Sequence, residues 1–175
     1  GQGTLSPPSE SEGGSVFGSA ASSETAGTDE KLQGVLSNLA LPAGNGTWSV
    51  YACDRANNTE GAIQDARMQA ASLIKLYIMG AVYENYDSII AQYGQSSVDS
   101  HLYSMITVSD NDAANTLVSY LGGGDSSTGM SVVNDFCSEK GYSSTHMGRL
   151  LLASNQYDDN YTSVSDCGHF LKEVY

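Results

Sequence analysis

Basic side chains are scarce in this chain: seven lysines and arginines stand against twenty aspartates and glutamates, which gives a formal net charge of −13. Nucleic-acid binding needs clustered basic residues that neutralise phosphates, and here the seven are scattered along the sequence. An acidic lipid surface would repel the chain for the same reason. We therefore expect no nucleic-acid partner and no docking on anionic lipid, and we attribute the acidity mainly to solubility.

Long apolar runs are also missing. No run reaches the roughly 18 to 20 residues that a membrane-spanning helix needs, so we expect no transmembrane segment. No secretory signal peptide is visible in the sequence. The 40% of hydrophobic residues is nevertheless enough for one folded domain with a core.

Metal-binding patterns are absent as well. The chain has three histidines and three cysteines, and none of them lies at the paired spacing of a zinc site. We therefore expect no metal and no cofactor. The histidines are expected to have structural or surface roles: His101, His146 and His169.

The beginning of the chain has few apolar residues. Residues 1–30 are dominated by Gly, Ser, Thr, Glu and Pro, with Phe17 as the only aromatic residue, and cannot bury enough apolar surface to fold. We expect residues 1–28 to form a disordered tether or to be a tag remnant. A helix is predicted next, because Thr28 or Asp29 can cap it and four apolar residues share one face: Leu32, Val35, Leu36 and Leu39.

The sequence also contains one strongly apolar helix with a single charge. The run from Ala70 to Tyr83 is apolar nearly all round, which is typical of a buried central helix. Lys75 is its only charged residue, and Ser72 lies three positions before it. Residues at this spacing lie on the same helix face, with β-carbons about 5 to 6 Å apart, so their side chains can form a hydrogen bond. No other lysine in the chain has a serine at this spacing.

The burial expected for Lys75 predicts an activated serine. Desolvation favours the neutral amine, which can accept the proton of Ser72. The free N–H of Ser72 at the helix start can donate to a developing oxyanion. The alternative is a structural helix from which Lys75 extends its ammonium to the surface, since a Ser-x-x-Lys tetrad also occurs by chance in a serine-rich chain.

A second motif, Ser109-Asp110-Asn111, follows between two helical patterns that run from Val98 to Val108 and from Ala113 to Leu121. A loop between helices can direct a hydroxyl and a carboxamide into a cleft. Asp110 or Asn111 can also cap the helix that begins near Asp112, a role that is compatible with catalysis.

With these ordered motifs the chain resembles the class A β-lactamases and the wider superfamily of penicillin-recognising serine hydrolases. Within this superfamily it resembles in particular the lipoprotein-type serine hydrolases of Gram-positive bacteria. The segment from Trp48 to Cys53 resembles the family's first strand. The segments Met147 to Leu151 and Asp159 to Val164 resemble the region that leads into its later helices. The resemblance covers roughly Lys31 to Tyr175.

The resemblance implies an α/β fold, in detail α+β, of the β-lactamase and transpeptidase type. Residues 29–69 are then the start of the α/β subdomain, with an N-terminal helix and the first strand. Residues 70–175 are the helical subdomain that carries both motifs. A tether at residues 1–28 fits a secreted protein that is lipid-anchored upstream and held at the bacterial cell surface.

The resemblance also implies roles for the motif residues. Ser72 is the nucleophile that forms an acyl-enzyme, Lys75 takes its proton, and Ser109 passes a proton to the leaving group. Asn111 binds the amide side chain of the substrate, and Asp110 supports the loop. We expect a hydrolase of β-lactams, or a D,D-peptidase or penicillin-binding protein with slow deacylation that acts on a D-alanyl peptide. A non-catalytic surface module that binds cell-wall peptide is the alternative from another class.

Two departures from the family pattern qualify these expectations. The glutamate that activates the deacylating water has no counterpart in the short loop of residues 150–159, where Asp158 or Asp159 either replaces it or only shapes a turn. No Lys-Thr-Gly follows, although in the family its cation holds the substrate carboxylate and its strands complete the sheet. Because one strand cannot form a sheet alone, we expect a fragment, a chain cut at the helical subdomain, or a C-terminal companion piece.

The cysteines allow two states. If the protein is exported, Cys137 and Cys167 lie on helical segments that can pack together and form a disulfide. Buried free thiols are the alternative. Cys53 would then find a partner in the further strands, since the first and last strands of the family are neighbours.

Overall fold

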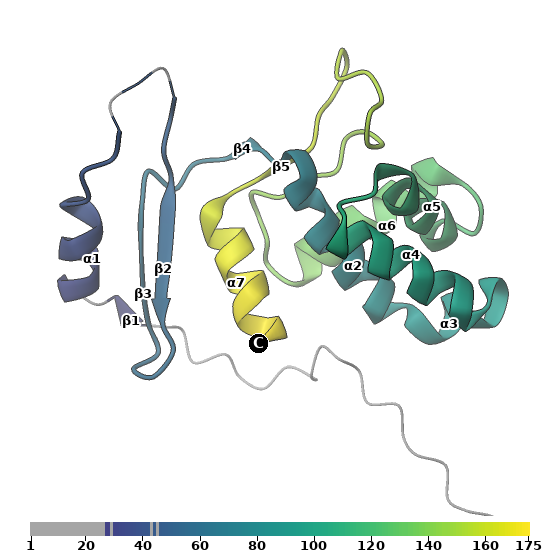
Figure 1. Cartoon of the computed structure of the whole chain (residues 1–175), viewed down its shortest axis with the longest axis horizontal. Coiled ribbons are helices and arrows are strands. Elements are labelled where there is room, and N and C mark those ends of the chain that lie inside the picture. Colours follow the sequence, from purple (N-terminus) through teal and green to yellow (C-terminus); the bar gives the residue numbers. More distant parts are fainter. Residues whose placement is uncertain (1–26, 29, 43, 45) are drawn as a thin grey trace, which may run out of the picture.

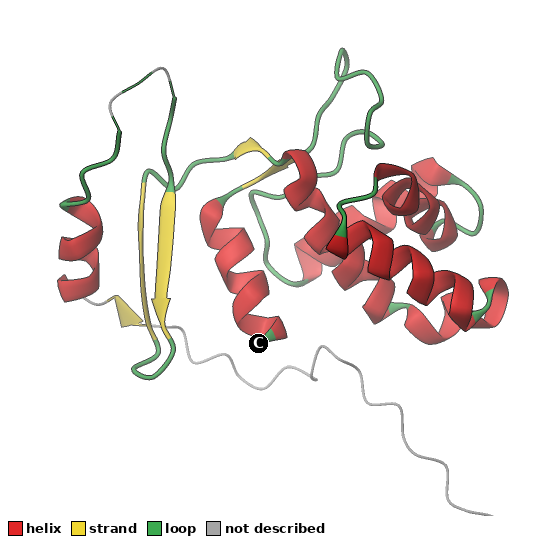
Figure 2. Ribbon diagram, in the orientation of Figure 1, coloured by secondary structure: helices red, strands yellow, loops and turns green. Residues whose placement is uncertain are grey.

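The computed structural model describes residues 27–28, 30–42, 44 and 46–175, so the tether predicted at residues 1–28 lies almost wholly outside the described residues. The protein is α+β (Figure 1 and Figure 2). Its elements follow in this order: β1 (Gly27–Thr28), α1 (Glu30–Ser37), β2 (Val50–Asp54), β3 (Thr59–Ile63), β4 (Met68–Gln69), the 3-10 helix η1 (Ala71–Leu73), α2 (Ile74–Glu84), α3 (Tyr86–Tyr93), α4 (Gln95–Thr107), α5 (Asn111–Leu121), α6 (Ser126–Glu139), β5 (Tyr161–Thr162) and α7 (Val164–Val174).

The predicted first strand is present as β2, but it does not stand alone. It pairs antiparallel with β3, from Val50 opposite Ile63 to Asp54 opposite Thr59, and the sheet order is β1-β3-β2. The hairpin turn forms because the Asp54 carboxylate accepts hydrogen bonds from the Asn57 side chain at 2.6 Å and from the backbone N–H of Ala56 at 3.0 Å. The expectation of a single strand is therefore corrected, and β2 lies at one edge of a three-stranded sheet.

The hairpin lies between α1 and α7 (Figure 1). Gly61 of β3 faces Leu36 of α1, where an added β-carbon would lie 3.1 Å from the leucine side chain. On the other face, the Tyr51 ring occupies the space that a side chain at Gly168 of α7 would need. The apolar face predicted for α1 is only partly used: Leu36 is buried, but Leu39 lies beyond the end of the helix and is exposed.

The hydrophobic core surrounds α2, as the apolar run predicts. Ile74, Tyr77, Ile78, Ala81 and Val82 are fully buried. They pack among α4, α5, α6 and α7, which contribute further buried residues to the same cluster. Within the described residues, no helix is long and apolar enough to cross a membrane.

The long loop between α6 and β5 is fixed by two partly buried amide side chains. Asn134 of α6 pairs with the backbone of Met147, donating to its carbonyl at 3.0 Å and accepting from its N–H at 2.7 Å. Asn115 of α5 pairs with Leu151 in the same way, at 3.1 and 2.9 Å. Each amide side chain bonds the N–H and the carbonyl of one loop residue, as a neighbouring strand would. The loop therefore keeps a defined path although it contains neither helix nor strand.

Cys137 and Cys167 are free thiols in the structure, in place of the disulfide considered above. The Cys167 sulfur lies 3.4 Å from the Tyr77 hydroxyl and 3.7 Å from Oγ1 of Thr162, which keeps it on the α2 side of α7. Cys137 is buried on α6, where desolvation raises the pKa of its thiol to about 12 and makes it inert. Cys53 is also a free thiol.

Candidate functional site

Ser72 lies in η1, the short helix that leads directly into α2. Its side chain is exposed, and the preceding residue Ala71 has a φ of +45°, a left-handed conformation that costs energy for a residue with a β-carbon. A hydrogen bond to a distant segment holds this turn: the N–H of Ala70 donates to the carbonyl of Asn160 at 2.8 Å. The sharp turn thus presents the Ser72 hydroxyl at the surface above a buried helix.

Lys75 is buried, with 3% of its surface exposed, and does not extend to solvent. Its Nζ donates to Oγ of Ser109 at 2.9 Å, to the carbonyl oxygen of Ser109 at 2.6 Å and to Oδ1 of Asn111 at 2.8 Å. The Ser72 hydroxyl oxygen lies 3.4 Å away. The two motifs, separated by more than thirty residues of sequence, therefore meet at one amine.

Two effects act in opposite directions on the pKa of Lys75. Burial lowers the pKa of the amine below its ordinary value, and the nearby Asp110 carboxylate opposes this by favouring the charged form. The direction matches the expectation of a lysine that is easier to deprotonate than a surface lysine. Burial of the lysine side chain removes the alternative of an ammonium extended to the surface.

Ser109 and Asp110 form the turn between α4 and α5. Ser109 has a φ of +56°, again the left-handed region, which directs both its hydroxyl and its carbonyl at Lys75. Asp110 is the N-cap of α5, where its carboxylate accepts a hydrogen bond from the N–H of Ala113 at 2.8 Å. Of the two predicted capping residues, Asp110 has this role, and Asn111 is the first helical residue.

This arrangement can move a proton. An ammonium has three N–H donors, and the three shortest contacts of Nζ go to Ser109 and Asn111. A neutral amine keeps two N–H groups and gains a lone pair, which can accept the hydrogen of the Ser72 hydroxyl. Ser109 touches the same amine and can pass a proton onward. The cluster is thus suited to activating a serine oxygen and reprotonating a leaving group.

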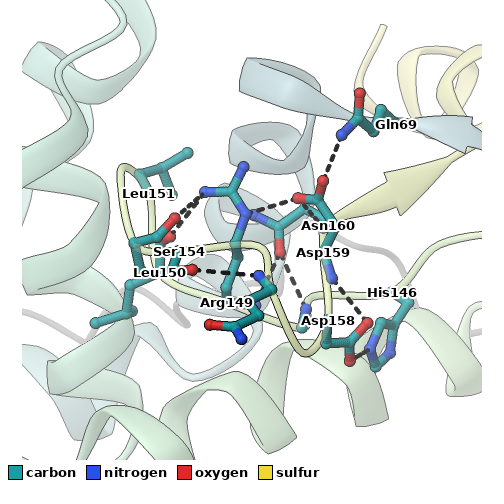
Figure 3. A network of polar contacts seen from close by, with 12 residues as sticks. Gln69, His146, Arg149, Leu150, Leu151, Ser154, Asp158, Asp159 and Asn160 are labelled. Atoms are coloured by element: carbon teal, nitrogen blue, oxygen red, sulfur yellow. Dashed lines mark hydrogen bonds and ion pairs between the residues drawn. The ribbon is translucent and has the colours of Figure 1, made fainter.

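The loop that precedes β5 is held by a network of polar contacts that reaches Gln69 (Figure 3). Arg149 donates from Nε to Asp159 at 2.7 Å, and Gln69, three residues before Ser72, donates to the other oxygen of Asp159. A hydrogen bond from the N–H of Asn160, followed by the one from Gln69, lowers the pKa of Asp159 to about 2, and Arg149 adds to the effect. Asp159 therefore joins the loop to the strand that leads to the nucleophile.

Asp158 faces His146 across the loop, with Oδ2 2.6 Å from Nε2 of the imidazole (Figure 3). This hydrogen bond holds the pKa of Asp158 below its ordinary value. Both carboxylates thus already accept hydrogen bonds from protein side chains. The role of a water-activating base stays a prediction for each of them, and their lowered pKa values do not favour it, because a strong acid is a weak base.

A hollow of about 480 Å³ lies beside the candidate nucleophile. It is lined by β2, β4, the segment from Thr162 into α7, and Leu73, the residue after Ser72. Leu73 is half exposed, and Val108, the residue before Ser109, is 73% exposed. Apolar side chains therefore border both serines.

Some residues of this site were not singled out from the sequence. Gln69 and Asn160 had no motif to mark them, because their importance comes from contacts across the chain. Arg149 and Asp159 belong to segments that resembled the family, but their ion pair was not foreseen. In the described part of the chain, no group of His, Cys, Asp and Glu residues could hold a metal ion.

The chain matches a known protein family. The model of the β-lactamase enzyme family matches residues 86–175, about half of the chain, which include Ser109 to Asn111 but not Ser72 or Lys75. No curated protein and no solved structure matches the chain.

Proposed function

Because the chain belongs to the β-lactamase enzyme family, we propose that it is a serine hydrolase in which Ser72 is acylated by a β-lactam. The oxygen of Ser72 attacks the lactam carbonyl carbon, and its proton passes to Lys75. The carbon–nitrogen bond of the ring breaks, and Ser109 delivers the proton to the departing nitrogen. Water then cleaves the ester and releases the ring-opened acid.

One observation carries this proposal: the buried amine of Lys75 lies within reach of Ser72, Ser109 and Asn111 together. Within the described residues no carboxylate lies at ion-pair distance from Lys75, whose Nζ contacts hydroxyl, carbonyl and carboxamide oxygens of the two motifs. Asn111 directs its carboxamide at the same site, which fits binding of the substrate's amide group. Asp110 holds the turn that carries both.

A second candidate is a D,D-peptidase or penicillin-binding protein with slow deacylation. It is supported by the loop of residues 148–160, where Asp159 has both oxygens in hydrogen bonds and a pKa of about 2. Without an effective base for water, the acyl-enzyme is long-lived. The substrate would then be a D-alanyl peptide, and a β-lactam would act as an inhibitor.

We also propose that further strands complete this site and that the protein works outside the cell membrane, tethered to the bacterial surface. The first part is supported by the position of β2 at the edge of the sheet, where a further strand can pair with its backbone. The second part follows from the substrate class. Binding of a separately produced C-terminal companion, measured by titration calorimetry, tests the first part.

The first test is the intact mass of the chain over time after addition of excess benzylpenicillin. We expect an adduct equal to the mass of the intact drug, located by peptide mapping at Ser72. Ser72→Ala should abolish the adduct without a change in melting temperature. Ser138→Ala, an exposed serine on α6, is the matched control and should keep it.

The time course separates the candidates. An adduct that clears while penicilloate accumulates makes the chain a β-lactamase. An adduct that persists makes it the slowly deacylating peptidase. An adduct that survives in Ser72→Ala removes Ser72 from the nucleophile role, and an intact chain that is never acylated, with or without its companion, leaves only the non-catalytic binding module.

A further inference from the structure

A groove of about 510 Å³ lies between α2, the helix that carries Lys75, and α4, the helix that ends just before Ser109. Helix α2 starts at the cluster and α4 ends at it, so the two helices run in opposite directions. Met79 lies one turn after Lys75, and Thr107 is the last residue of α4. These two residues line the near end of the groove.

The walls of the groove are apolar and aromatic. Tyr103 is 71% exposed and Ile106 is 43% exposed, which is unusual for large side chains that line a concave surface. At the far end the rings of Tyr83 and Tyr86 stack, with centroids 5.8 Å apart and an angle of 22° between planes. The hydroxyl of Tyr86 donates to Oδ1 of Asp99 at 2.6 Å, which fixes the ring.

Asp99 gives the far end a negative charge. It is the one charged residue among those that line the groove, and within the described residues no lysine or arginine pairs with it. The chain as a whole carries a net charge of −13, so the field of the entire protein also favours a cation over an anion. Aromatic faces beside a carboxylate attract an ammonium or a guanidinium and offer nothing to an anion.

We propose that this groove is a subsite for a positively charged group on an extended acyl chain of the substrate. The inference rests on the proposed function, because it takes Ser72 as the reacting end. Asp99 lies two helical turns before the end of α4, a distance of about 12 Å at 1.5 Å per residue. An extended peptide covers about 3.3 to 3.6 Å per residue, so the cation belongs about three to four residues from the reacting carbonyl.

Binding of two peptides tests the subsite. Both end in D-alanyl-D-alanine and differ only at the fourth residue before the reacting bond, which is lysine in one and the uncharged norleucine in the other. Their dissociation constants are measured by NMR titration of the full chain carrying Ser72→Ala, so that neither peptide is consumed. We expect the lysine peptide to bind about fivefold more tightly, the size of a cation–π contact joined to an exposed ion pair.

Variants identify the source of this preference. Asp99→Asn should bring the two dissociation constants together, and so should salt at about 1 M, which shortens the Debye length to about 3 Å. Asp135→Asn, which removes the same charge from an exposed position on α6, should keep the preference. Equal binding of the two peptides, or a preference that survives in Asp99→Asn, would overturn the proposal. A dimer in sedimentation velocity that excludes both peptides would also overturn it, in favour of a surface between two copies of this chain.

The test with benzylpenicillin keeps the two proposals apart. An adduct at Ser72 without a lysine preference rejects the subsite and leaves the proposed function in place. A lysine preference that depends on Asp99, in a chain that is never acylated, rejects the function and leaves the groove as a cation-binding site.

Discussion

Asp110 has two roles that a single substitution can separate. It caps α5 through its hydrogen bond to Ala113, and its charge raises the pKa of Lys75 against the larger lowering effect of burial. Asparagine caps a helix about as well as aspartate, because its side-chain oxygen accepts the same hydrogen bond. Asp110→Asn should therefore remove the electrostatic role and keep the structural one.

We expect Asp110→Asn to lower the pKa of Lys75 further. Acylation through neutral Lys75 rises as pH increases through this pKa, so the rising limb of the pH–rate profile should move to lower pH. The measurement is the rate of benzylpenicillin adduct formation from pH 6 to pH 10, with the melting temperature as a check on folding.

Asp112→Asn is the matched control, since Asp112 is exposed in the first turn of the same helix and does not contribute to the pKa of Lys75. The pH–rate profile of Asp112→Asn should match that of the wild type. A shift of Asp110→Asn to higher pH, or no shift, would show that Lys75 is not the base whose titration limits acylation.

At the residue scale the sequence could predict which side chains meet but not how the backbone directs them. The spacing of Ser72 and Lys75 predicted that these two lie together, and the family resemblance brought Ser109 to the same site, but the contact of Lys75 with Asn111 was not predicted. The left-handed φ of Ala71 and of Ser109 had no sequence signal, because neither is glycine. Such conformations are imposed by surrounding contacts, here the bonds of Ala70 to Asn160 and of Ser109 to Lys75.

The loop of residues 148–160 should depend on pH through Asp159. Its folded pKa of about 2 lies below the ordinary value of 3.8, so the carboxylate stabilises the folded state above pH 3.8. That stabilisation decreases as pH falls towards 2, where the folded state also takes up the proton. We expect the free energy of unfolding of Asp159→Asn to lie below that of the wild type by a constant amount from pH 7 to about pH 4, and to converge with it at lower pH.

Urea unfolding at a series of pH values measures both curves. Asp135→Asn gives the baseline for loss of one negative charge. A difference between wild type and Asp159→Asn that persists unchanged to pH 2 would mean that Asp159 acts through shape and not through its charge. Because Gln69 connects Asp159 to the strand before Ser72, the variant should also be acylated more slowly.

The contact between α5 and α6 depends on one glycine. A β-carbon at Gly129 would lie 1.8 Å from the carbonyl oxygen of Val118, which is backbone and cannot rotate away. Gly129→Ala must therefore push the two helices apart, and we expect it to lower the free energy of unfolding by about 3 kcal/mol, the upper part of the range for overpacked cores. Chemical unfolding monitored by far-UV circular dichroism measures this.

Gly34→Ala is the matched control for that substitution. Gly34 lies in α1, and a β-carbon there meets nothing within 4 Å. We expect it to stabilise the protein by about 0.5 to 1 kcal/mol, because alanine loses less conformational entropy than glycine in a helix. Equal effects of the two substitutions would show that helix propensity, and not the approach of α5 to α6, decides the outcome at Gly129.

At the scale of elements, periodicity predicted several helices well, but it did not single out α3 (Tyr86–Tyr93), and it predicted the sheet poorly. The apolar run gave α2, and the patterns on either side of Ser109 gave α4 and α5 within a few residues. β3 was missed because Thr59 to Ile63 is a short segment with a central glycine and only two aliphatic residues after it. Its place in the sheet depends on pairing with β2 and on α1, and both are long-range contacts that no local pattern encodes.

The two parts of the molecule differ in how many apolar side chains they bury. Among the described residues of α1 and the β2–β3 hairpin, Leu36 is the one buried hydrophobic side chain. In contrast, α2 alone contributes Ile74, Tyr77, Ile78 and Val82, all fully buried. Cooperative units of low stability are those with few buried apolar contacts. The predicted boundary between residues 29–69 and 70–175 therefore has a physical test.

We expect amides of β2 and β3 to exchange with solvent at least on the order of a hundredfold faster than those of α2 and α5, through an opening that leaves the helical core folded. This opening should show a weaker dependence on urea than global unfolding, because it exposes less surface. Hydrogen exchange read by mass spectrometry, peptide by peptide, measures both quantities. Equal protection and equal urea dependence would show that the hairpin and the core unfold as one unit. If strands pair with the free edge of β2, as proposed, their addition should slow exchange in β2 more than in α5, since added hydrogen bonds protect the edge that receives them.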